Sequence, residues 1–139
     1  MEKINPKELR IGNLVRFRET RREKSKSIVP NDKTEFAIRG ILLRERIIGR
    51  DNLVWQINYI EPIPLTEEWL LSLGFNKCKS YSGDEHTIDY TSGFAYINSF
   101  DDTISFRGKG TANWDRIKYV HQLQNLYFAL TGNELVYSL

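Results

Sequence analysis

The stretch IEPIPLTEEWLLSLGF, residues 60–75, divides the chain into two halves. Its two prolines cannot donate to a β-ladder, so a strand arriving from the N-terminal side has to end here. Thr66 stands at an N-cap position, and the two glutamates that follow suit the positive end of a helix dipole. The next apolar residues predict a two-turn helix that ends at Gly74. We therefore expect residues 62–74 to form a proline hinge and a short helix.

The residues before this hinge have the pattern of several short strands. In EFAIRGILLRERII, residues 35–48, the apolar alternation changes phase around Gly40, which predicts a bulge or a sharp bend. After a turn, alternate apolar residues continue through LVWQINY, residues 53–59. We expect residues 1–61 to fold as a small, bent, SH3-like antiparallel β-barrel with a polar, basic loop at residues 19–34.

The residues after the hinge combine short strands with one clear helix. Turn signals recur about every ten residues, which predicts an antiparallel meander, and residues 108–113 read as a loop. Over residues 116–131 the apolar side chains follow helical spacing, and Gly132 can end the helix. We expect residues 75–139 to form an antiparallel sheet packed with this amphipathic C-terminal helix, so the predicted fold class is α+β. The predicted buried stripe of the helix is Val120, Leu123, Tyr127 and Leu130.

Positive charge is concentrated in the first part of the chain. Residues 1–50 hold 14 of the 20 lysines and arginines but only 7 of the 18 acidic residues. Such a cluster attracts phosphates and other anions. The alternative interpretation is a solvated loop whose charges keep an edge strand from pairing with another chain. The candidate ligand-binding residues are Arg16, Arg18, Arg21, Arg22, Lys24 and Lys26, together with Trp114 and His121 near the expected cleft between the halves.

The sequence contains no pattern typical of a catalytic or metal site. His86 and His121 have no metal-ligand partners at suitable spacing, and Cys78, the single cysteine, excludes an internal disulfide and has no base nearby. We therefore expect no catalytic residue, no metal and no cofactor. A binding module is favoured over an enzyme, and a small nuclease or hydrolase that uses one of the histidines is the alternative.

The composition and the lack of a long apolar run predict a globular protein without a membrane segment. Hydrophobic residues make up 40% and charged residues 27% of the chain, which is typical of globular domains. No apolar run approaches the roughly 18 residues of a membrane-spanning helix. The first residues show no secretory signal, and we expect the chain to lie in the cytoplasm.

Three segments are distinctive when they are taken together. They are PKELRIGNLV at residues 6–15, IEPIPLTEEWLLSLGF at residues 60–75 and IKYVHQLQNLYFALTGNEL at residues 117–135. They resemble a family of small uncharacterised proteins of gut anaerobic bacteria that often occur in prophages, phages and other mobile elements. The resemblance implies a mobile-element context and brings no catalytic residue to these positions.

The sequence therefore supports three functional hypotheses. The leading one is a non-enzymatic binding module of phage or mobile-element origin that contacts an anionic partner, namely nucleic acid, a nucleotide-like ligand or an acidic protein surface. The second is a phage counter-defence protein that sequesters a nucleotide signal or blocks a host immune protein. The third is a structural or assembly protein, a homo-oligomer in which the helix at residues 116–131 serves both the core and a subunit contact.

Overall fold

The fold is described from a computed structural model of the chain. The expected basic loop at residues 19–34 and Trp114 lie outside the described part. The structure describes residues 4–17, 35–42, 46–49, 52–80, 83–90, 93–98, 103–106, 110–113 and 116–135.

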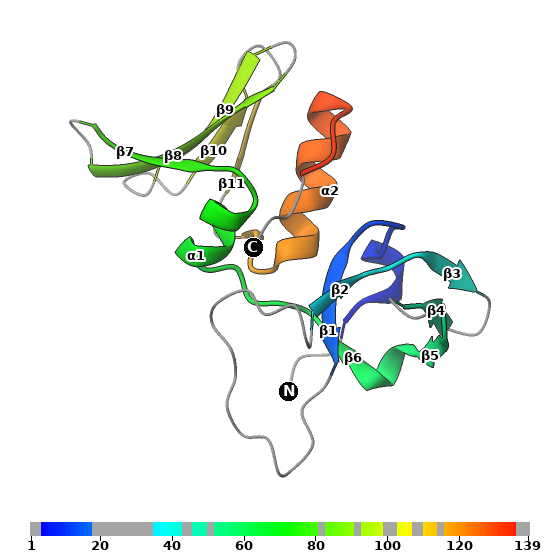
Figure 1. Ribbon diagram of the computed structural model, residues 1–139. Helices are drawn as coiled ribbons and strands as arrows, with labels where there is room; N and C mark the ends of the chain where they lie inside the picture. The colour runs from blue at the N-terminus through cyan, green and yellow to red at the C-terminus, as the bar shows by residue number, and fades with distance from the viewer. Residues whose placement is uncertain are drawn as a thin grey trace.

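The N-terminal half consists of short strands in two antiparallel sheets (Figure 1). One sheet has the order β2-β1-β6, and the other has the order β3-β4-β5. The expected break at Gly40 is present, because β2 ends at Ala37 and β3 begins at Gly40. The elements are η1 (Pro6–Glu8), β1 (Leu14–Phe17), β2 (Glu35–Ala37), β3 (Gly40–Leu42), β4 (Arg46–Ile48), β5 (Val54–Gln56), η2 (Ile57–Tyr59) and β6 (Ile60–Glu61).

The two small sheets share one apolar cluster. Phe17 stacks on Phe36 with ring centroids 4.6 Å apart, and its ring lies 4.9 Å from that of Trp55 on the other sheet. The expectation of antiparallel strands is confirmed. The described strands do not close into a barrel, because the break before Gly40 carries the chain from one three-stranded sheet into a separate one. The buried members of the cluster are Ile4, Val15, Phe36, Ile38, Ile47 and Ile60.

The predicted short helix is confirmed. Helix α1 spans Glu67–Ser72, and the Oγ1 atom of Thr66 accepts the N–H of Trp69 at 3.3 Å. The Trp69 side chain is fully buried. Gly74 ends this turn with φ of +99°, a conformation that a side chain would strain.

The C-terminal half is an antiparallel meander with the strand order β11-β10-β9-β8-β7. The prediction of a loop at residues 108–113 is wrong, because Gly110–Asn113 forms β11 along β10. This segment has few strand-forming residues, so the pairing with β10 decides its structure rather than its own propensity. The strands are β7 (Asn76–Ser80), β8 (Gly83–Tyr90), β9 (Gly93–Asn98), β10 (Thr103–Phe106) and β11 (Gly110–Asn113).

The C-terminal helix α2 spans Val120–Thr131, so the prediction that it begins at residue 116 is wrong by four residues. The residues before it are extended because they pair with the proline hinge. The N–H of Leu65 donates to the carbonyl of Lys118 at 3.0 Å. Gly132 ends the helix as expected, with φ of +74°.

Helix α2 lies between the five-stranded sheet and the N-terminal half (Figure 1). Its apolar side chains share a core with α1 and the sheet, and Leu14 of β1 joins the same core. The five-stranded sheet, α1 and strand β1 therefore all contact this one helix. None of the helices in the described ranges is long and apolar enough to cross a membrane.

Candidate functional site

The site is built on the face of α2 that turns away from the five-stranded sheet. Of the stripe predicted from helical spacing, Val120, Leu123 and Tyr127 are at most 3% exposed, and Leu130 is partly buried against the same core. An adjoining face carries His121, Gln124, Asn125 and Phe128, which also follow the helical period of three or four residues. This second face contacts the segment that leads into β1.

Gln124 fixes the backbone of this segment. Its side chain is 2% exposed, its Oε1 atom accepts the N–H of Leu14 at 2.7 Å, and its Nε2 atom donates to the carbonyl of Gly12 at 3.2 Å. Both groups of the amide are thus paired with buried backbone. Such bonds allow only one register between the helix and the strand.

Asn125 continues this row of amide contacts one position further along the helix. Its Oδ1 atom accepts from Asn13 Nδ2 at 2.8 Å and from Arg10 Nε at 3.1 Å, and its Nδ2 atom donates to the carbonyl of Glu8. Asn13 is itself fully buried, and its Oδ1 atom accepts the N–H of Arg10 at 2.7 Å. The segment from residue 8 to residue 14 is therefore bonded to α2 along its length.

The guanidinium of Arg10 is held on several sides. It forms a two-pronged ion pair with Glu134, and its NH2 group also donates to the carbonyl of Gln124 at 3.3 Å. Its carbon atom lies 4.4 Å from the ring centroid of Phe128, which is a cation–π contact. The charge of Arg10 is therefore balanced inside the protein, and its side chain draws the backbone toward α2.

Pairing between the first two strands stops abruptly. The last backbone bonds run from Gly12 N–H to the Ile38 carbonyl at 2.7 Å and from Ile38 N–H to the Asn13 carbonyl at 2.9 Å. At Gly12 the chain turns with φ of +95°, so residues 9–11 leave the line of the strand and run toward α2. Within the described residues, β3 consequently pairs with β4 alone.

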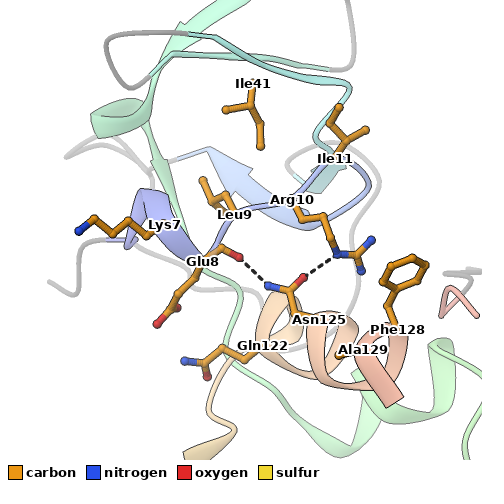
Figure 2. A pocket seen from close by; sticks show the side chains of 10 residues that line it. All are labelled: Lys7, Glu8, Leu9, Arg10, Ile11, Ile41, Gln122, Asn125, Phe128 and Ala129. Carbon is orange, nitrogen blue, oxygen red and sulfur yellow. Dashed lines mark hydrogen bonds between the residues drawn. The ribbon is translucent and has the colours of Figure 1, made fainter. Parts of the chain in front are cut away.

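An open cavity of about 780 Å³ occupies the gap between residues 7–11, β3 and α2. Figure 2 shows Ile41 and Ile11 on one side of it and Phe128 on the helix opposite. Volumes of roughly 300–1,000 Å³ are typical of ligand sites. The cavity is lined by Lys7, Glu8, Leu9, Arg10, Ile11, Ile41, Gln122, Asn125, Phe128 and Ala129.

His121, a predicted ligand-binding residue, is buried below the cavity wall. Its side chain is 1% exposed, and its Nε2 atom lies 3.2 Å from Oε2 of Glu8. Since a carboxylate only accepts, Nε2 carries the proton and donates it. Within the described residues the buried Nδ1 atom has no hydrogen-bond partner. His121 is therefore not among the residues that line the cavity, and it positions Glu8, which is; that His121 contacts a ligand stays a prediction.

Burial also sets the charge of His121. Desolvation lowers the pKa of this imidazole below its ordinary value, although the Glu8 carboxylate opposes the shift. The ring is therefore neutral around pH 7, and it stacks on Tyr119 with centroids 5.9 Å apart. A neutral ring in this position has a packing role rather than the role of a surface cation.

Arg16 is the only member of the predicted basic cluster that the structure describes, and it is 5% exposed. Its Nε atom lies 2.6 Å from Oε1 of Glu61 on β6, and Glu35 is opposite on β2. The charge of Arg16 is therefore paired inside the protein, and its contact with a ligand stays a prediction. Removing one partner of a buried ion pair is costly in free energy, because it leaves the other charge buried and unpaired. The other predicted cations, Arg18, Arg21, Arg22, Lys24 and Lys26, lie outside the described residues, as does Trp114.

The second histidine belongs to a surface cluster between α1 and the sheet. Oε1 of Glu67 lies 2.8 Å from Lys77 Nζ and 3.4 Å from His86 Nε2. The hydrogen bond from Lys77 is the main reason why the pKa of Glu67 is lowered, and His86 adds to it. Across the described ranges no three histidine, cysteine, aspartate or glutamate side chains gather as metal ligands would.

Sequence reasoning missed the residues that shape the cavity. Arg10, Asn13 and Gln124 carry no motif, and each acts through backbone that is distant in sequence. One signal was available, because His121, Gln124, Asn125 and Phe128 share a helix face that is too polar for a core and contains no lysine or glutamate. Such a face is typical of a helix side that is buried against polar backbone.

Comparison of the chain with protein-family models, with curated proteins and with solved structures finds no match in any of the three.

Proposed function

We propose that the protein is a non-enzymatic binding module of the cytoplasm whose N-terminal half contacts an anionic partner. The observation that carries the proposal is the uncompensated positive charge of this half. Arg10 and Arg16 are neutralised by Glu134 and Glu61, and the other 12 lysines and arginines of residues 1–50 still outnumber the 7 acidic residues there. Among the described residues of this half, Lys7 and Arg39 are exposed and have no ion pair.

The state of the histidines supports binding over catalysis. A general base needs an accessible nitrogen within hydrogen-bond reach of its substrate. The Nε2 atom of His121 is hydrogen-bonded to Glu8, and the ring as a whole is buried. His86 faces Glu67 on another side of the molecule, so the two histidines do not converge on one site.

The order of the strands supports an SH3-like arrangement of residues 1–61. The chain passes through β1, the broken strand β2 and β3, then β4, β5 and the 3₁₀ turn η2, and returns in β6 to pair with β1. Arg16 and Glu35 are opposite each other, so the two ends of the basic segment begin at one end of the same sheet. Barrels of this kind commonly place binding residues in the connections between strands.

The test is the salt dependence of nucleic-acid binding. We expect fluorescent single-stranded DNA and RNA to bind the parent protein, with affinity that falls between about 50 and about 200 mM salt. Replacing Arg21, Arg22, Lys24 and Lys26 with serine should lower the affinity at least about 10-fold and flatten the salt slope, with little change in melting temperature.

The double variant Arg116→Ser/Lys118→Ser is the control, because it removes exposed cations from the segment just before α2. Its affinity should stay close to that of the parent. If the quadruple variant binds as tightly as the parent at both salt concentrations, the basic segment is not the contact and this proposal fails.

A second candidate function is the blockade of a host immune protein, in the mobile-element context that the sequence resemblance implies. The observation that favours a protein partner is the apolar surface around the cavity. Ile11, Ile41 and Phe128 are 58%, 47% and 39% exposed, and exposed apolar patches commonly mark protein contacts. Light scattering of the purified chain separates this candidate from a homo-oligomer, since a partner-binding module should remain a monomer over a wide range of concentrations.

A further inference from the structure

We propose that the cavity beside β3 is a strand-addition slot, which binds an extended acidic peptide segment of a partner protein along the free edge of β3. This inference goes beyond the proposed function, because it uses none of the residues of the basic segment. It rests on the shape of the gap, on the chemistry of its walls and on the charges at its rim.

The gap lies in line with an interrupted ladder. β1 and the residues before it pair with β2 as far as Gly12 and Ile38, and then residues 9–11 turn away toward α2. If the pairing had continued in the same register, residues 9–11 would cover the edge of β3. The edge is therefore left without a described neighbour at the place where a neighbouring strand is expected. An added peptide would resume the ladder there.

The contacts of α2 hold this gap open. Arg10 is bound to Glu134 and Asn125 and lies over Phe128, so its backbone cannot return to β3 without breaking these contacts. Asn125 also binds the Glu8 carbonyl on the same segment. The gap is thus part of the fold, and a peptide would not need to open it. Preformed sites of this kind lose less entropy when they bind.

The walls and the floor suit alternate side chains of a strand. One wall of the cavity is formed by Ile41 of β3 together with Leu9 and Ile11. The other wall is formed by Phe128 and Ala129 of α2. In a bound strand, alternate side chains point to opposite faces, so one set would meet these apolar residues and the other would face solvent. We infer apolar residues at every second position of the peptide.

The rim determines the charge of the partner. Glu134 is bound to Arg10, whereas the Glu8 carboxylate faces the imidazole of His121, which does not balance its charge. Lys7 lies at one end of the cavity, and Arg39 immediately precedes β3, where its NH1 atom binds the neutral amide of Asn52 at 3.2 Å. Lys7, Arg39 and Glu8 therefore lack an opposite charge beside the slot, which leaves a net charge of +1, and acidic side chains at the solvent-facing positions of a peptide complement this excess.

The probe is a capped synthetic peptide of about eight residues that alternates valine and glutamate. We expect it to bind the full chain and to shift the backbone amide resonances of residues 9–11 and 40–42. The same peptide methylated at alternate backbone nitrogens should lose binding, because it can no longer pair with a strand edge. A version with lysine in place of glutamate should bind more weakly.

Two protein variants form a matched pair. Ile41→Glu replaces an apolar wall of the slot with a negative charge, which repels the glutamates of the peptide. It should weaken peptide binding at least about 10-fold. Leu71→Glu makes the same change on α1, at a side chain that is 48% exposed compared with 47% for Ile41, and it should leave binding unchanged. Lys7→Glu should reverse the preference and favour the lysine peptide.

The proposal is overturned if the methylated peptide binds as well as the parent peptide, if Ile41→Glu and Leu71→Glu have equal effects, or if no alternating peptide binds. It is also overturned if the chain alone forms a dimer that Ile41→Glu disrupts, because the slot would then belong to a second copy. Nucleic-acid binding of the same variants separates the two proposals. Ile41→Glu should retain it, whereas the serine variant of the basic segment should retain peptide binding.

Discussion

The two faces of α2 both contact other elements of the fold, but they hold their neighbours by different means. Val120, Leu123 and Tyr127 pack on the five-stranded sheet through contacts that have no fixed direction. Gln124 and Asn125 bind particular backbone atoms of the segment that leads into β1. The comparison teaches that one face supplies most of the stability, while the other fixes the register and decides where the pairing of β1 with β2 stops.

The apolar face should show the largest effect of a substitution. Leu123 is fully buried in the core that joins α1, α2 and the sheet. Leu123→Ala should lower the free energy of unfolding by about 2–5 kcal/mol, because it removes buried area and leaves a cavity. Urea titration monitored by tryptophan fluorescence measures this loss. A loss below about 1 kcal/mol would contradict the view that this face carries the stability.

The polar face should show a smaller loss of stability together with a change in local structure. Gln124→Leu keeps the volume and leaves the Leu14 N–H and the Gly12 carbonyl without their partner. We expect about 1–3 kcal/mol of destabilisation, with amide resonance shifts concentrated in residues 8–14.

The control for Gln124→Leu is Gln56→Leu, which makes the same replacement at an exposed position of β5. The control should leave stability nearly unchanged. If the resonances of residues 8–14 were unaffected in Gln124→Leu, the polar face would not be setting the register.

The smallest expected effect is the pH dependence of the stability that His121, on the polar face of α2, contributes. Burial lowers the pKa of His121 in the folded state, so the unfolded chain binds the proton more readily. The contribution of this group is complete above the ordinary histidine pKa of about 6.5. It is lost progressively as the pH falls from there through the lower pKa of the folded state.

The slope from this one group is at most about 1.4 kcal/mol per pH unit. His121→Phe can still stack on Tyr119 and removes the titrating ring. Urea titrations between about pH 7 and pH 5 should show a slope in the parent that is reduced in this variant. An equal slope in both proteins would assign the effect to another group.

The elements set by local chemistry could be predicted from the sequence. Thr66 and Gly74 mark the ends of α1 because capping depends on the residue itself, and the buried stripe of α2 follows from its helical period. The start of α2 could not be predicted in this way, because pairing of Lys118 with the hinge keeps residues 117–119 extended. The strand β11 likewise depends on its partner β10.

The candidate site was harder to predict for the same reason. Its cavity exists because Arg10 meets Glu134, more than a hundred residues later, and no local pattern records such a contact. Arg16 looked like a surface cation because it stands beside other arginines. In the structure its neighbours across the sheet are Glu35 and Glu61, so strand register buries its charge.

The central claim is that α2 holds residues 9–11 away from β3 and leaves a strand edge open. Native-state hydrogen exchange of the backbone amides tests it most directly. The amides of Gly12 and Ile38 donate to described carbonyl groups, so they should be protected. In an edge strand, alternate amides point away from the neighbouring strand, so at least one amide of Gly40, Ile41 and Leu42 should exchange almost as fast as in an unfolded chain. Protection of all three amides to the level of Ile38 would contradict the account.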